Sequence, residues 1–336
     1  MKIGNIDLDE EVLIIAEVGN NHEGSYTLAE DMIGLAAKAG ATAVKFQTIV
    51  PEKLVSVSQA DRIAQLKKFQ LSYDDFEKLS RTARQEGIMF LSTPFDVDSA
   101  HFLEHFVPAF KIASGDNNFL ALIDVIARTG KPVIMSAGMT ELSQTEKTKD
   151  FIESIWRECG IEQDLAVLHS VASYPTETKD ANLIFIKELQ GLGVTVGYSD
   201  HTMGIEASIL SVAVGARVVE KHFTIAKNYS RFHDHQLSAD PQEFGEIVQR
   251  IRQAEELLGK AGKRVLDAEE KVIRAARRSI TARCDLKKGE RISIKDIAWL
   301  RPGGGLAPGE EQQILGKRLC RNIARGGKIL LEDTTV

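Results

Sequence analysis

Two lysines interrupt apolar runs of the sequence and are the first candidates for chemistry. Lys45 lies within AVKFQ (43–47), and Lys111 lies within AFKIA (109–113). Because lysine is almost never fully buried without a counter-charge, each must extend to solvent or pair with a carboxylate such as Glu17. Two such lysines on different runs favour a further interpretation, a bound anionic ligand. Hydroxyl donors to the same anion follow other runs, at Ser114, Ser136 and Ser199.

Two histidines, His201 and His222, end neighbouring apolar runs. Two imidazoles combined with oxygen ligands suit Mn, Fe or Zn better than Mg or Ca. Asp200 and Glu220 stand next to them in the sequence and are candidate outer partners of such a cation. The alternative is a pair of structural histidines that hydrogen-bond to their surroundings.

The remaining histidines give weaker indications. His22 follows the first apolar run and is either a third polar contact or a loop cap. The triplet HDH (233–235) is either a metal-binding tract or an active-site loop whose useful group is Asp234. His101 and His105 share one predicted helical face, and we expect them at the surface.

Eight short apolar runs position these residues. The runs are nearly continuous in hydrophobicity, as expected for strands buried on both faces, and helix-period segments lie between most of them. The predicted strands are Val12–Glu17, Ala43–Gln47, Ile88–Ser92, Ala109–Ala113, Pro132–Ser136, Leu165–His169, Val194–Ser199 and Arg217–His222. The predicted helices are Leu28–Ala39, Tyr73–Glu86, Leu120–Arg128, Glu141–Cys159, Glu206–Val214 and Pro241–Leu258.

This alternation predicts an α/β fold, a (β/α)8 TIM barrel, because eight parallel strands with helices close such a barrel. An open doubly wound sheet would require a Gly-rich GxGxxG turn after its first strand, and EVGNNHEG (17–24) does not fit that pattern. The chemistry of a TIM barrel gathers at the C-terminal ends of its strands. Met1–Leu8 is expected to form a small strand or hairpin at the opposite end.

The pattern changes near residue 260, which divides the chain into a barrel domain (1–260), a charged linker (261–276) and a small module (277–336). Within the module we predict short strands and turns over Arg278–Cys284, Ile292–Ile294 and Ile297–Arg301, and a mobile loop at Gly303–Gly305. A module of about 60 residues folds only marginally alone, so it is expected to lean on a partner surface.

Composition limits the classes of protein. The 336 residues include 42 Lys and Arg against 48 Asp and Glu, a mildly acidic balance that argues against nucleic-acid binding. No apolar run reaches the roughly 18 residues that a membrane span needs, and the N-terminus lacks a signal-peptide core. Three widely separated cysteines, Cys159, Cys284 and Cys320, exclude a disulfide framework or zinc ribbon. We therefore expect a cytoplasmic globular protein.

Several motifs, taken together and in this order, resemble the N-acetylneuraminate (sialic acid) synthase family. They are AEVGNNHEG (16–24), VKFQT (44–48), FLSTPF (90–95), FKIASGD (110–116), SAGM (136–139), HSVASYPT (169–176), GYSDHT (197–202) and EKHFT (220–224). ARCDLKKGE (282–290) and LRPGGGL (300–306) resemble the family's C-terminal SAF (antifreeze-like) domain. The resemblance implies a transferase that condenses phosphoenolpyruvate with an N-acetylated mannosamine-type sugar. Its products are a nine-carbon nonulosonic acid and phosphate, released by carbon–oxygen cleavage.

The resemblance also implies roles for individual residues. Positions that hold the phosphate and carboxylate of phosphoenolpyruvate match Lys45, Lys111, Ser114, Ser136 and Ser199. The two ligands of a divalent metal, expected to be Mn²⁺ or Mg²⁺, match His201 and His222. Positions near the sugar or the reacting centre match Gln47, Tyr174 and three catalytic candidates, Glu17, Glu220 and Asp234. Arg301 matches an arginine that the SAF domain offers to the sugar's N-acyl group across the interface of a domain-swapped homodimer.

Two departures from the family pattern concern the sugar. Asp116 stands where close sialate synthases have Glu, and Ala172 stands where they have Asn, although Ser173 offers a polar group. The acceptor is therefore expected to be N-acetylmannosamine or a related 2,4-diacetamido sugar, as in legionaminic or pseudaminic acid synthases. Rival hypotheses are a barrel synthase that acts on erythrose 4-phosphate or arabinose 5-phosphate, and a non-catalytic carbohydrate-binding or ice-binding protein.

Overall fold

Eight parallel strands form a single sheet at the centre of the first part of the chain. They are β3 (Leu13–Gly19), β4 (Ala43–Thr48), β5 (Met89–Pro94), β6 (Phe110–Ile112), β7 (Val133–Ser136), β8 (Leu165–Ser170), β9 (Thr195–Asp200) and β10 (Val218–His222). Their order, β5-β4-β3-β10-β9-β8-β7-β6, makes the first and last of them neighbours. β5 and β6 contact each other but share no hydrogen-bonded ladder in the described residues. The sheet is thus a nearly closed (β/α)8 barrel, and the predicted fold class is confirmed.

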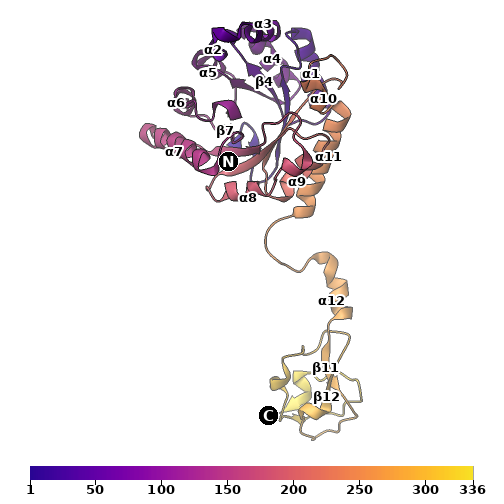
Figure 1. Ribbon diagram of the computed structural model, residues 1–336. Coiled ribbons are helices and arrows are strands. Elements are labelled where there is room, and N and C mark those ends of the chain that lie inside the picture. The colour runs from indigo at the N-terminus through magenta and orange to yellow at the C-terminus, as the bar shows by residue number, and fades with distance from the viewer. Residues whose placement is uncertain (336) are drawn as a thin grey trace. The chain divides into compact units, whose positions relative to one another are not determined.

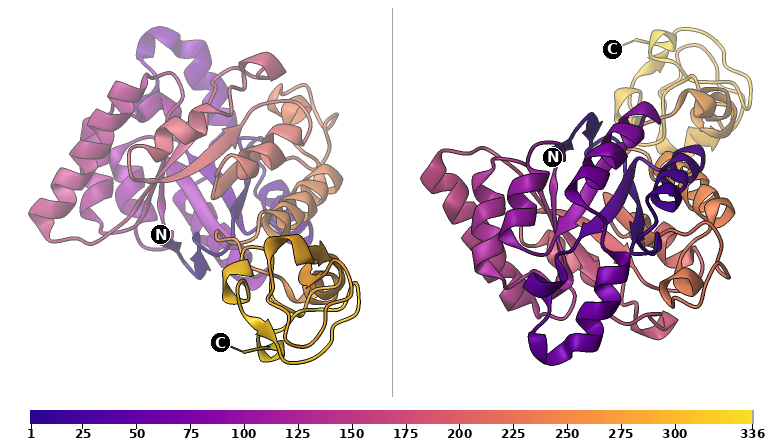
Figure 2. Two further views of the ribbon diagram at one scale, coloured as in Figure 1. Left: turned by 90° about the horizontal axis from the view of Figure 1, so that it is seen from below. Right: turned by 90° about the horizontal axis from the view of Figure 1, so that it is seen from above.

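The structure is a computed structural model that describes residues 1–335. The chain divides into two compact units, Met1–Gly259 and a second unit that begins at Lys260. In the first unit, helices surround the strands (Figures 1 and 2). They are α1 (Tyr26–Lys38), α2 (Pro51–Leu54), α3 (Ala60–Phe69), α4 (Tyr73–Gln85), α5 (Val97–Leu103), α6 (Leu120–Arg128), α7 (Leu142–Cys159), α8 (Phe185–Gln190), α9 (Glu206–Ala213), α10 (Asp234–Leu237) and α11 (Pro241–Leu258).

Local sequence signals set the ends of the longer helices. Ser72 and Asp75 form a reciprocal capping box at the start of α4, and the Asp240 carboxylate caps α11 ahead of Pro241. Gly160 ends α7 in the left-handed conformation, with a φ of 66°. Among residues 1–335, we find no helix with both the length and the apolar character that crossing a bilayer demands.

The N-terminal hairpin closes one end of the barrel. β1 (Lys2–Ile3) pairs with β2 (Ile6–Asp7), and Ile3, Ile6 and Leu8 pack onto apolar residues at the N-terminal ends of the strands. Burial of these three side chains stabilises the closed end by the hydrophobic effect. The hairpin expected within Met1–Leu8 is confirmed, and the opposite end of the barrel is left for the polar residues.

The second unit has its own small apolar core and several short strands. Its elements are η4 (Asp267–Glu269), α12 (Glu270–Ala276), β11 (Ser279–Ala282), η5 (Ile294–Asp296), β12 (Ile297–Leu300), η6 (Glu311–Gln313), β13 (Arg318–Leu319), η7 (Leu331–Asp333) and β14 (Thr334–Thr335). β11 pairs with β12 over a core that includes Ile280 and Ile297. The strand predicted over Ile292–Ile294 is wrong, because Ser293 and Asp296 form a capping box that starts a 3₁₀ turn there.

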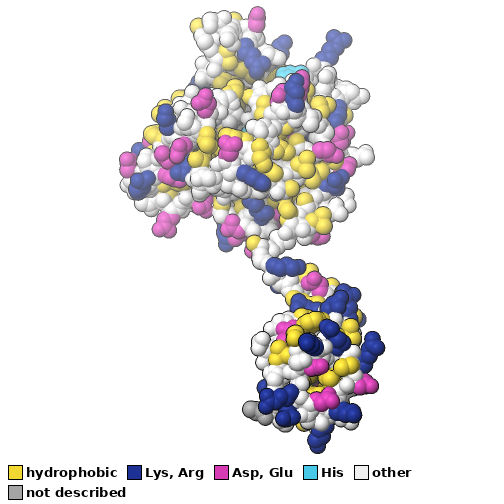
Figure 3. All heavy atoms as spheres, turned by 60° about the horizontal axis from the view of Figure 1, so that its bottom comes forward, with side chains coloured by type: hydrophobic (Ala, Val, Ile, Leu, Met, Phe, Trp, Pro, Cys, Tyr) yellow, Lys and Arg dark blue, Asp and Glu magenta, His cyan; other side chains and the backbone are white. Residues whose placement is uncertain are grey.

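The two units carry opposite net charge. Residues 260–336 contain 18 Lys and Arg against 10 Asp and Glu, whereas residues 1–259 contain 24 against 38. Figure 3 shows many Lys and Arg side chains at the surface of the second unit. Charges of this kind promote association with an oppositely charged surface.

Candidate active site

A cavity of about 310 Å³, here the mouth cavity, lies at the C-terminal ends of the barrel strands. The structure brings eleven of the predicted site residues together around it. They are Glu17, Lys45, Gln47, Lys111, Ser114, Ser136, Tyr174, Ser199, His201, Glu220 and His222. Six further residues line it. Sequence reasoning did not propose Thr93, Phe95, Ala113, Gly115 and Met139 for the site, although all of them lie at or just after the ends of predicted strands, and it noted Ala172 as a departure from the family pattern.

Strand register explains why these side chains meet. Glu17 of β3 is paired in register with Lys45 of β4 on one side and with His222 of β10 on the other. On the β9–β10 pair, Ser199 lies opposite Glu220, and the Ser199 hydroxyl donates to Glu220 Oε1 at 2.9 Å. Because successive side chains of a strand point to opposite faces, every second residue near these strand ends faces the cavity.

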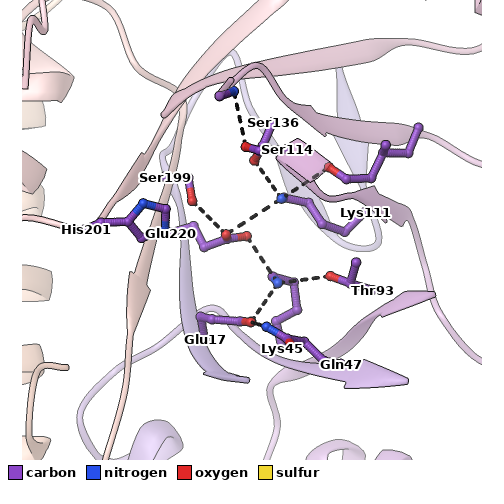
Figure 4. Close-up of polar contacts among 12 residues, drawn as sticks. Glu17, Lys45, Gln47, Thr93, Lys111, Ser114, Ser136, Ser199, His201 and Glu220 are labelled. Carbon is purple, nitrogen blue, oxygen red and sulfur yellow. Dashed lines mark hydrogen bonds and ion pairs between the residues drawn. The ribbon is translucent and has the colours of Figure 1, made fainter. Parts of the chain in front are cut away.

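Two lysines and two glutamates form the floor of the mouth cavity (Figure 4). Lys45 Nζ lies 2.6 Å from Glu17 Oε2 and 3.6 Å from Glu220 Oε2, and Lys111 Nζ lies 3.7 Å from Glu220 Oε1. All four side chains are at most 7% exposed. The pairing of Lys45 with Glu17 that the sequence left open is therefore present, yet both residues also line the cavity.

Hydroxyl groups complete the contacts of the two ammonium groups. Lys45 donates to Thr93 Oγ1 at 3.1 Å, and Lys111 donates to Ser136 Oγ at 2.7 Å. Ser114 accepts a hydrogen bond from Gly138 N at 3.1 Å. Its hydroxyl therefore lies beside Ser136 on the Lys111 side of the cavity (Figure 4).

Burial and charge pull the pKa values of the floor residues apart. Burial raises the pKa of Glu17 to about 7, against the opposing influence of Lys45. Burial also acts to raise the pKa of Glu220, but Lys111 and Lys45 together lower it to about 2. Burial lowers the pKa of Lys111 to about 8, although Glu220 opposes this shift. Near pH 7 the floor thus holds two cations against one fully and one partly ionised carboxylate, an excess of positive charge that suits an anion.

Two neutral imidazoles lie beside this floor. The ring centroids of His201 and His222 are 5.6 Å apart, and the Tyr174 ring is 4.2 Å from that of His201. His201 Nδ1 lies 2.8 Å from the carbonyl oxygen of Val171, which leaves its other nitrogen for the cavity. Burial lowers the pKa of both histidines, so both are uncharged near neutral pH. The predicted convergence of the two side chains is confirmed.

Neutral imidazole is the form that binds a metal ion, and Nδ1 of His222 is buried without a hydrogen-bond partner in the described residues. The pair therefore fits a divalent cation as two of its ligands. Residues 1–335 contain no group of three or more His, Cys, Asp or Glu side chains arranged to hold a metal ion. Any further ligands would have to be water or substrate oxygens.

Comparisons with known proteins agree with this geometry. Residues 32–263 match the NeuB family, and residues 277–333 match the SAF domain. The chain belongs to the NeuB family. Similar relatives include the N,N'-diacetyllegionaminic acid synthase of Legionella pneumophila, 39% identical over 95% of this chain and 93% of that protein. The pseudaminic acid synthase of Campylobacter jejuni is 38% identical over 99% of each.

Among solved structures, the N-acetylneuraminic acid (sialic acid) synthetase of Leptospira borgpetersenii has a TM-score of 0.76 and 32% identity. The match covers 81% of this chain and 94% of that one. The family resemblance that the motifs indicated is therefore confirmed, and so is the SAF domain.

Three predicted site residues of this NeuB-family chain lie outside the mouth cavity. Asp234 lines a neighbouring cavity of about 180 Å³, here the annex, which shares Gln47, Tyr174 and His222 with the mouth cavity. Asp116 lines neither; its Oδ2 atom is buried and has no hydrogen-bond partner among residues 1–335, and burial raises the pKa of Asp116 to about 6. Arg301 follows β12 in the second unit and is exposed there.

One predicted contact is wrong. Asp200 is not an outer partner of the histidines, because its carboxylate accepts hydrogen bonds from Thr202, Ser208 and Lys221 on the outer face of the barrel. Strand alternation gives the reason: Ser199 faces the cavity, so its neighbour Asp200 faces the helices.

Two other histidines, His22 and His235, have structural roles in the NeuB-family barrel. His22 Nδ1 accepts a hydrogen bond from Gly24 N at 3.1 Å, so it is a loop cap. His235 is fully buried between Thr224, at 2.6 Å, and Glu23, at 2.9 Å. This connection holds the loop that carries Asp234. The active-site-loop interpretation of residues 233–235 therefore fits the structure better than a metal tract.

Proposed function

We propose that this chain is a nonulosonic acid synthase. It condenses phosphoenolpyruvate with N-acetylmannosamine or a related 2,4-diacetamido sugar and releases phosphate by carbon–oxygen cleavage. The observation that carries the proposal is the pair of buried lysines around Glu220, beside two neutral imidazoles, in one cavity at the barrel mouth. Its relatives named legionaminic and pseudaminic acid synthases support the same reaction class.

The anion contacts fall on two sides of the cavity floor. Lys45 and Lys111 offset the charge of the carboxylate and phosphate of phosphoenolpyruvate, and such contacts are stronger where water is excluded. The hydroxyl groups of Ser114, Ser136 and Ser199 are the proposed hydrogen-bond donors to the same anion. An anion that enters replaces the lysine–hydroxyl contacts already present, so little rearrangement of the protein is required.

The condensation requires proton transfers among the attacking water, the aldehyde oxygen and the phosphate, and it requires stabilisation of the positive charge that develops at carbon 2. Carbon 3 of phosphoenolpyruvate attacks the aldehyde carbon, the double bond supplies the electron pair, and positive character develops at carbon 2. Glu220, held ionised by the two lysines, stabilises that centre. Glu17, with a pKa raised to about 7, accepts a proton from the water that adds to carbon 2. Glu17 passes this proton on to the aldehyde oxygen, which becomes a hydroxyl group. The bond between carbon 2 and the phosphate oxygen then breaks while the new carbon 2 hydroxyl gives its proton to the departing phosphate, which leaves the keto acid and hydrogen phosphate.

His201 and His222 would hold a divalent cation, which we propose to be Mn²⁺, with Mg²⁺ as the alternative. When bound, the ion supplies Lewis acidity toward the aldehyde oxygen of the sugar. Tyr174 and Asp234, at the border with the annex, orient the sugar chain. In the double variant His201→Ala, His222→Ala we expect Mn²⁺ binding and turnover to be lost while phosphoenolpyruvate still binds. Undiminished Mn²⁺ binding would refute the assignment.

We further propose that Arg301 acts across a domain-swapped homodimer, with the domains as predicted: barrel (1–260), linker (261–276) and SAF domain (277–336). The acidic barrel and the basic second unit have complementary charge, which favours docking of one on the other. Mixing inactive Arg301→Ala subunits with inactive Lys111→Ala subunits should restore part of the activity. No recovery after demonstrated subunit exchange would refute the shared site. We propose the cytoplasm as the location of the protein.

The cleavage direction tests the reaction itself. With ¹⁸O in the bridging oxygen of phosphoenolpyruvate, the label should leave with phosphate, and phosphate release should require the sugar. Label retained in the sugar acid would overturn the mechanism. Phosphate release only with erythrose 4-phosphate or arabinose 5-phosphate would support the rival barrel synthase. A carbohydrate-binding role without catalysis is not favoured, because the lysines, histidines and Glu17 are all present around one cavity.

A further inference from the structure

The pairing of β9 with β10 ends just before the two histidines proposed to bind the metal ion. The last residues paired in this parallel ladder are Asp200 and Lys221. His201 and His222 each come one residue later, so both lie beyond the last pair. On its other side β10 stays paired with β3 as far as His222. The separation of the two histidines therefore depends on contacts other than the β9–β10 ladder.

A buried ammonium group connects the two chain segments at this point. Lys221 Nζ donates to the carbonyl oxygen of Thr202 at 2.5 Å and to Asp200 Oδ2 at 3.1 Å. Lys221 directly precedes His222, and Thr202 directly follows His201. One side chain thus links the segment that carries the first imidazole to the segment that carries the second.

Asp200 holds the same turn from its other end. Its Oδ1 atom accepts hydrogen bonds from Thr202 N at 2.8 Å and from Thr202 Oγ1 at 2.7 Å, and Oδ2 accepts one from Ser208 Oγ at 2.6 Å. Asp200, Thr202, Ser208 and Lys221 are at most 4% exposed. A buried polar network whose members are satisfied in this way is rigid. The residues on both sides of His201 are therefore fixed in place.

The imidazole rings have unequal support of their own. The Val171 carbonyl oxygen orients the ring of His201, whereas Nδ1 of His222 has no hydrogen-bond partner among residues 1–335. The position of the His222 ring thus depends strongly on its backbone. Tight metal binding requires ligands that are already held in place, so a shift of either backbone segment would weaken it.

We infer that Lys221 and Asp200 are positioning residues for the metal site, and that the bridge from Lys221 to Thr202 sets the separation of His201 and His222. The pair acts on the backbone and not on the imidazole rings, which agrees with its place on the outer face of the barrel. The inference rests on the proposed function, because it requires that these two imidazoles bind the divalent cation.

Direct measurement of Mn²⁺ binding tests the inference. Free Mn²⁺ is followed by electron paramagnetic resonance while the full chain is titrated in the absence of phosphoenolpyruvate and sugar. Lys221→Met should bind Mn²⁺ about tenfold or more weakly than the unmodified protein, as expected when a residue that supports metal ligands is lost. Its affinity for phosphoenolpyruvate, measured by calorimetry, should be nearly unchanged because Lys45 and Lys111 are retained.

Two control variants separate positioning from a general loss of stability. Asp200→Asn, Lys221→Met contains no unpaired buried charge, so it should regain part of the stability that Lys221→Met loses. It should still bind Mn²⁺ about tenfold or more weakly, since Thr202 lacks the donor from β10. Ile126→Ala removes a fully buried side chain of α6 and should lower stability without changing Mn²⁺ affinity. The double variant also provides the measurement if Lys221→Met fails to fold.

The outcomes distinguish this inference from the proposed function. Undiminished Mn²⁺ affinity in folded Lys221→Met or in the double variant would overturn the inference alone. An equal loss of affinity in Ile126→Ala would assign the effect to stability and would also overturn it. Absence of Mn²⁺ binding in the unmodified protein, or binding that survives His201→Ala, His222→Ala, would refute the metal site itself and this inference with it.

Discussion

Two groups of buried lysine and carboxylate side chains lie on opposite faces of the barrel sheet, and the inner group borders the mouth cavity. The outer group is Asp200 and Lys221, whose side chains are 0% and 1% exposed. Asp200 accepts hydrogen bonds from Thr202 N and Oγ1, from Ser208 and from Lys221, at 2.6 to 3.1 Å. Lys221 also donates to the Thr202 carbonyl oxygen at 2.5 Å. Hydrogen bonds from other residues of the protein therefore satisfy both charged groups of this pair.

The inner group also pairs buried lysines with buried carboxylates, here Glu17 and Glu220, but its carboxylates accept fewer hydrogen bonds. Glu220 accepts one hydrogen bond, from Ser199, while its ion-pair distances to Lys45 and Lys111 are 3.6 and 3.7 Å. Its Oε2 atom is buried and accepts no hydrogen bond from residues 1–335. A buried polar atom left unpaired costs about 1–3 kcal/mol, which an incoming ligand can recover. A buried charge alone therefore does not identify a ligand site. A buried charged group that borders a cavity and still has an unsatisfied hydrogen-bond acceptor does identify one.

Lys111→Met should give the largest effect on activity and break the inner group selectively. Loss of one preorganised cation should lower kcat/KM for phosphoenolpyruvate by about 10³-fold. The free energy of unfolding should fall by no more than about 1 kcal/mol, since Glu220 keeps Lys45 and Ser199 as partners. Steady-state kinetics and urea denaturation measure both quantities. A loss of stability as large as the one expected for Lys221→Met would contradict the distinction between the inner and outer groups.

Lys221→Met should lower the stability of the protein strongly and leave the binding of phosphoenolpyruvate nearly unchanged. Removing this ammonium leaves Asp200 charged and buried without its counter-ion, so stability should fall by about 3–5 kcal/mol. At a temperature where the variant remains folded, the KM for phosphoenolpyruvate should stay within about threefold of the unmodified protein, because Lys221 faces away from the cavity. The double variant Asp200→Asn, Lys221→Met is the matched control and should recover part of the lost stability. A KM increase of 100-fold or more in the folded single variant would place Lys221 in the site.

The sequence predicts the positions of the strand ends, and the alternation of side chains along each strand predicts which of them face the cavity. The predicted strands end within two residues of the observed ones because the apolar runs are short and bounded by turns. The same alternation, applied to Ser199 and Glu220, would have placed Asp200 outside, and the outer-partner prediction overlooked it. The helix α3 could not be predicted in the same way, since Leu66 is its only buried residue and leaves no apolar period.

The annex shows a second limit of prediction from sequence. Phe69 and Phe232, which line it, lie in the helix α3 and in the loop after β10, more than 150 residues apart in the sequence, and the helix does not follow a strand end directly. The contact between Phe69 and Phe232 depends on the tertiary fold rather than on spacing. Asp116 illustrates the reverse case, because a matching motif position does not ensure that a side chain lines the cavity.

The smallest expected effect is the pH dependence of phosphoenolpyruvate binding, which sharpens the role of Lys111. Burial lowers the pKa of Lys111 to about 8, whereas Glu17 and Glu220 hold the pKa of Lys45 above its ordinary value despite burial. As the pH rises through 8, Lys111 in the free protein loses its proton and its charge, so the Kd should rise by about fivefold between pH 8 and 9. The phosphate group of the ligand titrates near pH 6 and keeps its charge over this range. Calorimetric titration from pH 7 to 9.5 measures the slope, and Lys111→Arg, which stays charged, should remove it. The same slope in Lys111→Arg would assign the titration to another group.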